Sequence, residues 1–474
     1  MIRTGHIWLA LTALLLFVTA FNIPGSLGIT GTKLDDSYPL VIEDAASRGA
    51  VFGTELIYTH GPLGYLYHPQ GLGGFRSQRL LYAVLRAAFS AYVCCTIATA
   101  TTLPIRIALL IWMVVQPLTP TVLYAGVAVR LLYPPALLWL KRAEWYALPA
   151  VCGLCGMVKF TELLSGSVVV SGVAVVFAYR GRWREAAQPV GVFALTVLGV
   201  WLAAGQPLGG LPDYLRNSWE VATGFAVMTV TAELAVLASG LAGVSVLLIG
   251  AAMAAFRAPR DIGRALALLP TLASAFITWK HGYMRADTHV ANFFNPLGAY
   301  AALLFVGMNR RDRWSNAVIA LALVIGVAGM RVAGFSLAEI TPGITRLAAV
   351  PSDVFRTKAA ASEKDAADQR HILDESVALP RIKAAVGSAP VDIFNYQQAY
   401  AYINGLVLRP RPVFQSYLAC TPRLQRINLD FYHSQRRRAF VLNSQWSPCR
   451  RGLLAKPRSS TSPHRTSSIQ LTTW

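Results

Sequence analysis

The chain has few charged residues for its length. Only 14% of its 474 residues are Asp, Glu, Lys or Arg, whereas 54% are hydrophobic. Soluble domains carry roughly 25% charged residues, so this chain has too little polar surface to fold in water as one globule. It also lacks a Walker-type phosphate loop, an HExxH zinc-protease motif and any internal repeat. The fold must therefore be built mainly from the hydrophobic segments.

Acidic residues are scarcest of all. The 23 Asp and Glu residues face 43 Lys and Arg residues, a formal net charge of +20. Such an excess indicates nucleic-acid binding only when the cations gather on one soluble face, and here most lie singly or in short clusters between apolar runs. The sequence therefore predicts a protein of the lipid bilayer with no nucleic-acid partner.

Hydrophobic runs of roughly spanning length predict a mainly α fold, a polytopic transmembrane helical bundle of about eleven helices. The first run could instead be the core of a signal peptide, but no small-residue cleavage site precedes the Pro24-Gly25 break. The predicted spans are 7–21, 80–100, 107–124, 126–140, 145–163, 167–179, 189–204, 234–256, 265–279, 295–308 and 317–333.

Orientation follows from the connections, because Lys and Arg are retained in cytoplasmic loops. Alternate connections carry Arg106, Lys141 and Arg142, Arg180 to Arg184, Arg257 to Arg264, and Arg310 to Arg313. The opposite loops, 22–79, 116–121, 162–166, 205–233 and 280–294, then face outward. We expect an integral plasma (inner) membrane protein with its N-terminus in the cytoplasm and its C-terminus outside.

Three regions are predicted on this basis. Residues 1–335 form the transmembrane domain with the outer loop 22–79, residues 336–446 a small extracytoplasmic α/β domain, and residues 447–474 a disordered basic tail without a function. Within the α/β domain we expect a polar, helical stretch after Ala333, strands at 391–395 and 413–417, and a helix at 397–404.

The cysteines fall into two groups. Cys152 and Cys155 form a CxxC pattern inside an apolar run, where small residues three apart favour helix packing over a metal or redox motif. Cys420 and Cys449 lie in the C-terminal part, where a disulfide would be compatible with an extracytoplasmic location.

Candidate chemistry concentrates in the first outer loop. Asp35 and Asp36 follow the first predicted span by about a dozen residues. Two neighbouring carboxylates this close to lipid cost desolvation energy unless water, a cation or a metal ion meets them. Two readings stay open, a solvated pair in a loop or a functional pair of acids.

The motifs around this pair resemble the first loop of C-type glycosyltransferases, which include the protein O-mannosyltransferases and aminoarabinose transferases. The matching positions are Asp35, Asp36, Tyr38, Gly49, His60, Pro62 and Leu63, and the later GMVKFTELLSG with Lys159 resembles their Lys-containing helix. The resemblance covers the first third of the chain and its topology. The family usually has Asp-Glu and His-Pro-Pro-Leu where this chain has Asp-Asp and His-Gly-Pro-Leu, which leaves the subfamily and substrate open.

The resemblance implies transfer of a sugar from a polyprenyl-phosphate carrier to an acceptor hydroxyl at the outer membrane face. Asp35 is then the first candidate for the general base, and Asp36 is the reserve, because neighbouring side chains point apart. A leaving lipid phosphate needs cations, for which the candidates are Lys159, Arg130 and Arg285. His60 and Lys280 complete the expected substrate contacts.

Each cation also has a structural alternative. Lys159 could snorkel to the interface or pair with Glu162, and Arg130, inside an apolar run, needs a partner that is either a carboxylate or a lipid phosphate. His60 and His68 could only shape the loop.

A second polar group lies in residues 280–289, which include His281. Asp287 and His289, together with Asp35, could bind a divalent metal ion, although the spacing matches no strong metal motif and an interfacial anchor is the alternative. Which cofactor the protein uses, if any beyond this possible metal ion, is not determined by the sequence. Two further functions stay open, a lipid or polysaccharide transporter or flippase, which predicts internal symmetry and broken helices, and a non-catalytic protein of envelope assembly.

Overall fold

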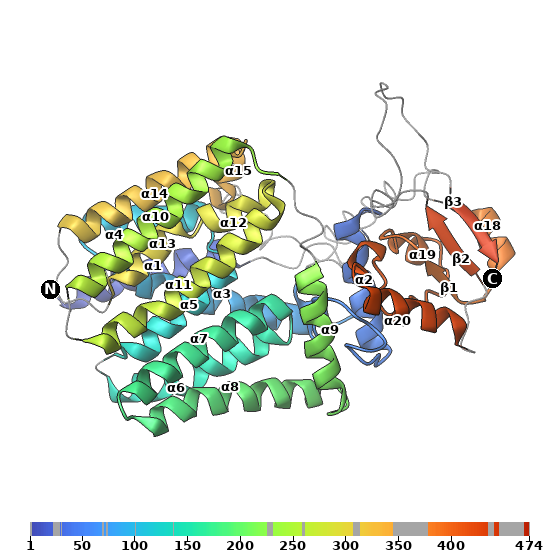
Figure 1. The fold of residues 1–474 in the computed structure, drawn as a ribbon, viewed down its shortest axis with the longest axis horizontal. Helices are drawn as coiled ribbons and strands as arrows, with labels where there is room; N and C mark the ends of the chain where they lie inside the picture. The colour runs from blue at the N-terminus through green and yellow to red at the C-terminus, as the bar shows by residue number, and fades with distance from the viewer. Residues whose placement is uncertain are drawn as a thin grey trace.

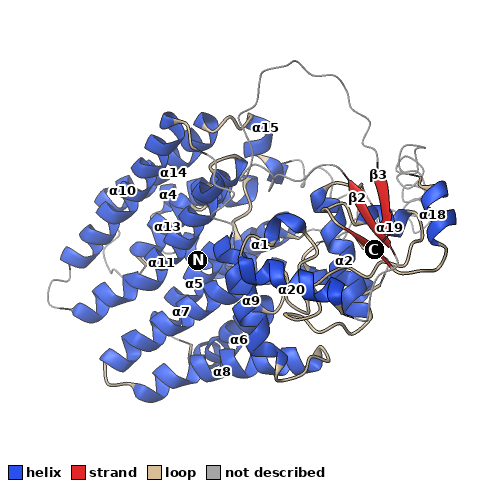
Figure 2. Cartoon of the chain, turned by 45° about the vertical axis from the view of Figure 1, so that its right-hand side comes forward, coloured by secondary structure: helices blue, strands red, loops and turns tan. Residues whose placement is uncertain are grey.

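The computed structural model describes most of the chain. The described residues are 2–21, 29, 31–68, 71–72, 74–99, 101–135, 137–224, 231–257, 261–306, 313–344, 378–434, 440–444 and 469–473. Helices dominate this part, and strands occur only near its C-terminal end (Figure 2). The prediction of a mainly α fold is confirmed.

Among the described residues, six helices are long and apolar enough to cross a membrane. They are α3 (Arg76–Thr99), α7 (Phe160–Tyr179), α8 (Trp183–Ala203), α10 (Leu234–Phe256), α11 (Ile262–Arg285) and α14 (Arg313–Val332). Large apolar side chains on α8 and α10 are exposed, for example Leu195, Leu234 and Phe256. Such surface is stable only in contact with lipid or another apolar partner. The chain is therefore a helical membrane protein.

Shorter helices complete the bundle, some between these six and others at its edges (Figure 1). They are α1 (Ile2–Ala20), α4 (Leu103–Val115), α5 (Pro120–Leu132), α6 (Leu138–Gly156), α12 (Ala291–Phe294), α13 (Leu297–Leu304) and α15 (Leu337–Ile340). Helix α5 is buried along nearly its whole length against α3, α7, α11 and α13. Its small and branched side chains let these neighbours approach closely, as is usual inside helical membrane proteins.

Several predicted span boundaries are wrong. The predicted span 107–124 runs across the turn between α4 and α5, and the predicted outer loop 162–166 lies inside α7. The predicted break at residue 125 falls inside α5, where a Cβ on Gly126 would lie 2.2 Å from Val93 Cγ1, so this glycine permits helix packing and does not end a helix. The predicted span 145–163 is divided by a turn between α6 and α7. This turn forms because residues of the first loop bond to it: Gly61 N donates to Val158 O at 3.1 Å, and Phe160 N donates to Thr59 O at 2.8 Å.

Part of the predicted loop 22–79 is a helix, α2 (Leu34–Ser47), followed by a short 3-10 turn at Gly64–Leu66. Helix α2 was not predicted, and it contains Pro39. Proline has no N–H to donate, but near the beginning of a helix this removes only one intrahelical bond. Most of α2 after Asp36 is buried. It lies with α9 (Gly210–Gly224) at one end of the bundle, which we call the site end (Figure 1).

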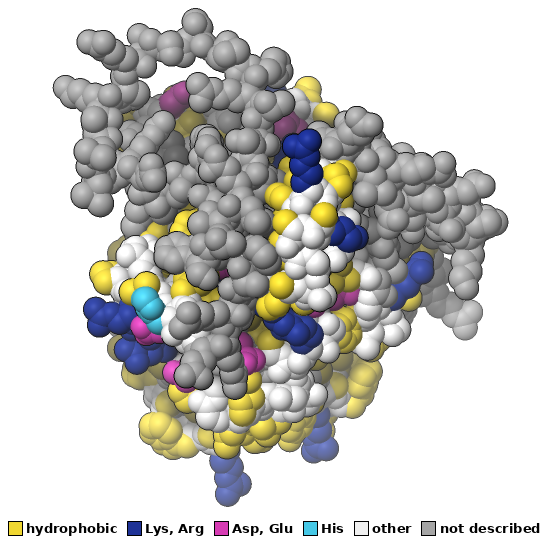
Figure 3. Space-filling view, turned by 90° about the vertical axis from the view of Figure 1, so that its right-hand side faces the viewer, with side chains coloured by type: hydrophobic (Ala, Val, Ile, Leu, Met, Phe, Trp, Pro, Cys, Tyr) yellow, Lys and Arg dark blue, Asp and Glu magenta, His cyan; other side chains and the backbone are white. Residues whose placement is uncertain are grey.

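The C-terminal segment, of which residues 378–434, 440–444 and 469–473 are described, also lies at the site end (Figure 1). It contains helices α18 (Pro380–Val386), α19 (Ala399–Ile403) and α20 (Pro422–His433), and strands β1 (Val391–Ile393), β2 (Phe440–Ser444) and β3 (Ile469–Thr473). The strands form one sheet in the order β1-β2-β3, with β1 parallel and β3 antiparallel to β2. Looking at the molecule from this side, Figure 3 shows basic and acidic side chains spread among apolar ones over the described surface.

Two expectations for this segment change, and a third is not tested. No strand forms at 413–417; Ser416–Leu418 is a 3-10 turn, and the Asn428 side chain bonds both the N–H and the C=O of Val413, at 2.9 and 3.0 Å. The predicted tail contains a strand, because β3 (Ile469–Thr473) pairs antiparallel with β2. Cys449 and most of the polar stretch after Ala333, residues 345–377, lie outside the described residues.

The turns at the opposite end of the bundle are basic. Arg180 and Arg264 both lie close enough to Tyr133 to act on its hydroxyl, and a Cβ on Gly263 would lie 2.8 Å from Arg180 Nε. Three connections far apart in the sequence therefore meet at this end, away from α2, α9 and the C-terminal segment (Figure 1).

Candidate functional site

The two acids of the first loop have different surroundings. Asp36 accepts a hydrogen bond from the backbone N–H of Lys33 at 3.3 Å and so closes the first turn of α2. Asp35 is exposed, and within the described residues its carboxylate has no hydrogen-bond donor. Asp36 therefore holds the helix, while Asp35 keeps its oxygens available for another molecule.

Next to Asp35 lies an aromatic cluster formed by Tyr38, Tyr58, His60, Tyr67 and His68. The ring of His60 stacks on Tyr58 with centroids 5.2 Å apart and lies 5.5 Å from Tyr38 and 5.3 Å from Tyr67. Asp35 is near enough to raise the pKa of Tyr38 further, beyond the rise that burial causes. The acid and the rings therefore belong to one site.

His60 is the least accessible member of the aromatic cluster. It is 2% exposed, and in the part of the chain that the structure describes neither ring nitrogen has a hydrogen-bond partner. Burial, Lys159 and His68 hold its pKa well below the usual value, so the ring is neutral. A buried, neutral imidazole with one donor and one acceptor unused is suited to a hydroxyl-bearing ligand or a water molecule.

His68 supplies a test of this packing. Its ring bonds with the Tyr38 hydroxyl, and burial, followed by Lys159 and Arg79, lowers its pKa to about 4. Because the unfolded chain binds a proton near pH 6.5, acid favours unfolding, and this contribution to stability is lost as the pH falls from 6.5 to 4. We expect the free energy of unfolding to fall by up to about 1.4 kcal/mol more per pH unit in the wild type than in His68→Gln. Parallel acid profiles of the two proteins would contradict the assignment.

Lys159 lies at the turn between α6 and α7, directly before α7. Its Nζ is 3.3 Å from the Tyr67 hydroxyl and 4.3 Å from the centre of the Tyr67 ring, and its backbone pairs with that of His60. The expected pairing with Glu162 does not occur: Arg86 Nη1 lies 2.8 Å from both oxygens of Glu162, and Tyr124 donates to it at 3.0 Å. Among the described residues, Lys159 has no carboxylate within 4.0 Å.

A small cavity of about 70 Å³ opens beside Lys159, and we call it the lysine pocket. Hydroxyl groups dominate its wall. The lining residues are Tyr67, Thr119, Pro120, Thr121, Tyr124, Lys159, Thr161, Glu162, Ser165, Thr278, His281 and Asn292. Because Arg86 already compensates Glu162, the half-buried Lys159 is the charge in this wall that lacks a counter-ion among the described residues. The lysine pocket can therefore hold an anionic group.

The C-terminal segment closes the other side of the aromatic cluster. The Tyr58 and Phe414 rings are 5.2 Å apart, and Tyr58 bonds with Tyr417. Burial raises the pKa of Tyr417, Asp35 adds to that rise and Arg285 opposes it. Arg285 also contacts Asp287, with Nη2 to Oδ2 at 2.9 Å. Tyr417 thus lies between an acid from α2 and a cation from the end of α11.

No family model, curated protein or solved structure matches this chain. The chemistry of the site must therefore be argued from its own residues.

Two expected contacts do not join the site. Arg130 lies in the last turn of α5, at the end away from the lysine pocket, where it pairs with Glu144 and lies over the Tyr92 ring at 5.8 Å. A cation in an apolar helix needs such a partner. Of the two partners expected for Arg130, a carboxylate or a lipid phosphate, the structure shows the carboxylate. Lys280 is exposed on α11, one residue before His281, which does line the lysine pocket.

The expected metal ligands have other partners. Asp287 accepts the backbone N–H of His289 at 3.0 Å and bonds the His289 ring as well as Arg285. Over the described ranges, no group of three or more His, Cys, Asp or Glu side chains is arranged to hold a metal ion. The His289 ring instead stacks on His281, with centroids 6.1 Å apart.

Three elements of the site escaped sequence reasoning. Tyr58 and Tyr67 complete the aromatic cluster, and Glu43 pairs with Arg79 behind it, with Oε2 and Nη2 2.6 Å apart. The density of rings in YTHGPLGYLYH could have indicated the tyrosines. Nothing local links Glu43 to Arg79, because both would be expected on a solvated surface.

Proposed function

We propose that this protein is a membrane glycosyltransferase that moves a sugar from a polyprenyl-phosphate donor to an acceptor hydroxyl. The proposal includes eleven membrane-crossing segments, namely α1, α3 to α8, α10, α11, α12 together with α13, and α14, with the N-terminus in the cytoplasm. The C-terminal segment then forms an extracytoplasmic α/β domain. The basic turns around Arg180 and Arg264 gather at the end opposite α2, which supports this orientation by the positive-inside rule.

One observation carries the proposal: an available carboxylate, Asp35, and a cation without a counter-ion among the described residues, Lys159, flank the same aromatic cluster. Inverting sugar transfer needs a base near the acceptor and positive charge near the leaving phosphate. A solvated loop pair would need neither the aromatic cluster nor a cation beside it. The resemblance of the first loop to C-type glycosyltransferases points to the same chemistry.

The reaction can be written with these groups. Asp35 accepts the proton of the acceptor hydroxyl, and the oxygen attacks the anomeric carbon of the donor. The bond between that carbon and the phosphate oxygen breaks, and the electron pair leaves with the polyprenyl phosphate. Lys159, on the rim of the lysine pocket, stabilises the charge that develops on that oxygen. Neutral His60 is placed to exchange hydrogen bonds with sugar hydroxyls.

Removing the cation tests the phosphate role. We expect Lys159→Met to lower the release of polyprenyl phosphate by about 10²-fold, the usual effect of losing one stabilising donor. The assay follows lipid-linked hexoses and pentoses with the purified protein in lipid vesicles. The matched control is Lys280→Met, which removes an equally positive but exposed side chain and should leave turnover unchanged. Equal turnover by the Lys159 variant and the wild type would remove Lys159 from the mechanism.

Adding a chelator to the same assay tests whether sugar transfer needs a divalent metal ion. The chemistry of Asp35 and Lys159 requires no divalent ion, so we expect turnover to persist. If the purified protein turns over no lipid-linked sugar, with or without the chelator, the proposed function is wrong.

A further inference from the structure

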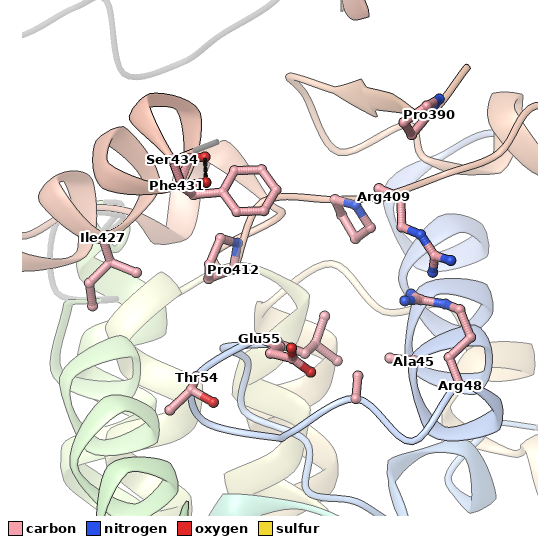
Figure 4. Close-up of a pocket in the computed structure, with 13 residues that line it drawn as sticks. Ala45, Arg48, Thr54, Glu55, Pro390, Arg409, Pro412, Ile427, Phe431 and Ser434 are labelled. Atoms are coloured by element: carbon pink, nitrogen blue, oxygen red, sulfur yellow. Dashed lines mark hydrogen bonds between the residues drawn. The ribbon is translucent and has the colours of Figure 1, made fainter. Parts of the chain in front are cut away.

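A cavity of about 890 Å³ lies between the end of α2, the loop that follows it and the C-terminal segment (Figure 4). Its charges are balanced. Arg48 pairs with Asp44, with Nη2 and Oδ2 2.9 Å apart, and Arg409 shares the lining with the Glu55 carboxylate. This cavity therefore shows no excess charge that would select an ion, and the lysine pocket differs from it in this respect.

The lysine pocket has one positive charge in excess, counted over the described residues. The acid in its wall, Glu162, is compensated by Arg86, which is not part of the lining. Lys159 contacts the hydroxyl and the ring of Tyr67, and both of these groups are neutral. An ammonium group has three N–H donors, so Lys159 can bond an anion and keep its contact with Tyr67.

The first turn of α5 forms another wall of the lysine pocket, through Thr119, Pro120, Thr121 and Tyr124. Thr119 is the N-cap residue of α5, where a hydroxyl usually accepts an N–H of the first turn. Here it makes no such bond, and within the described ranges its buried Oγ1 has no hydrogen-bond partner. The Thr121 N–H likewise has no acceptor in the part of the chain that the structure describes.

These features of the α5 wall share one preference with Lys159. A buried hydroxyl costs free energy unless a ligand or a water molecule meets it. The N-terminus of a helix, here one of 13 residues, carries the positive end of the helix dipole and favours an anion. The Thr119 hydroxyl, the Thr121 N–H and the Lys159 ammonium group therefore all suit an anionic occupant of the same small cavity.

The size of the lysine pocket limits what this anion is. Its volume of about 70 Å³ equals roughly two water molecules at ~30 Å³ each, and sites that enclose whole small molecules begin at ~300 Å³. A single phosphate group fits this space, whereas a sugar ring does not. Phosphate also presents several oxygens in different directions, which suits donors that come from α5 and from the turn before α7.

We infer that the first turn of α5 completes a phosphate site with Lys159, in which the Thr119 hydroxyl and the Thr121 N–H donate to the phosphate oxygens. A further role of Thr119, to position the phosphate that leaves during sugar transfer, rests on the proposed function. Binding of the phosphate does not rest on it. A lipid phosphate and free phosphate share this chemistry, so the test includes both.

The test is equilibrium binding of tritiated farnesyl phosphate to the full-length protein in nanodiscs of a zwitterionic lipid, with empty nanodiscs subtracted. Farnesol has the same chain without the phosphate, and we expect it to bind at least tenfold more weakly. Inorganic phosphate is added as a competitor. If it displaces the probe at the concentrations at which unlabelled farnesyl phosphate does, the site recognises free phosphate; if it does not, the site recognises phosphate carried by a lipid.

Thr119→Val removes the hydroxyl and keeps the shape of the side chain. It should weaken the binding of farnesyl phosphate about tenfold, the usual effect of losing a hydrogen bond to a charged group. Because Thr119 makes no cap bond, the thermal unfolding midpoint should not fall. Ser165→Ala is the matched control, since Ser165 lines the same pocket but already donates to Thr161 O at 2.8 Å. Ser165→Ala, and Arg48→Gln in the larger cavity, should bind the probe as the wild type does.

The outcomes separate this inference from the proposed function. If farnesyl phosphate binds no better than farnesol, or if Thr119→Val binds it as the wild type does, the inference is wrong, whether or not the protein transfers sugar. If farnesyl phosphate binds through Thr119 and Lys159 while the protein consumes no lipid-linked sugar, the phosphate site stands and the transferase proposal fails.

Discussion

Asp35→Asn is expected to lower the rate of sugar transfer by roughly 10² to 10⁴, the contribution of a positioned general base. The amide has the same shape as the carboxylate but cannot take up the acceptor's proton. Because Asp35 is exposed and has no hydrogen-bond donor among the described residues, the substitution should leave folding intact. The measurement is the initial rate of polyprenyl-phosphate release in vesicles, together with the thermal unfolding midpoint.

The neighbouring acid is the matched control. Asp36→Asn keeps an oxygen that can accept the Lys33 N–H, so its cost is limited to a fraction of the ~1 kcal/mol that a helix cap contributes. Its transfer rate should stay within a few-fold of the wild type. If Asp36→Asn loses activity and Asp35→Asn does not, the base has been assigned to the wrong residue. If both variants transfer sugar normally, the acids have no catalytic role.

The positions of the long helices could be predicted from the hydrophobic runs, because a run of about twenty apolar residues has few alternatives to a membrane helix. The runs predicted helix ends less well. Gly126 resembles a break in the sequence, but in the structure it lets Val93 approach α5. Whether a glycine ends a helix or permits close packing depends on the facing helix, which local sequence does not contain.

The acids and Lys159 became candidates because their positions resemble a known motif, but their partners in the structure could not be predicted. Lys159 is placed by the backbone of His60, 99 positions earlier in the chain, and Tyr417 reaches the same cluster from the C-terminal segment. These contacts arise when the first loop docks on the turn between α6 and α7. Conversely, Arg130 was a candidate only because its partner Glu144 was not evident from the sequence.

The second large effect is expected at the buried ion pair of Glu43 and Arg79, which lies behind the aromatic cluster. Glu43 and Arg79 are each 2% exposed, and they connect three elements: Glu43 Oε2 accepts Leu72 N at 2.7 Å, and Arg79 Nε donates to Tyr65 O at 2.9 Å. Helix α2, which carries Asp35, is thereby held to the beginning of α3. Removing one member leaves a buried charge without its counter-ion.

Glu43→Leu and Arg79→Leu are therefore each expected to destabilise the protein by about 3 to 5 kcal/mol. The double variant should lose much less than the sum of the two, because no isolated charge remains and only the contacts to Leu72 N and Tyr65 O are missing. The measurement is the free energy of unfolding in detergent for the wild type, both single variants and the double variant.

The exposed pair Arg182 and Glu185 provides the control for this cycle. Its side chains are 43% and 34% exposed, so Arg182→Leu should cost less than about 1 kcal/mol. Strictly additive losses in the Glu43 and Arg79 variants would mean that the two side chains act separately. In that case each side chain stabilises the protein through its other contacts, and the ion pair itself does not hold α2 to α3.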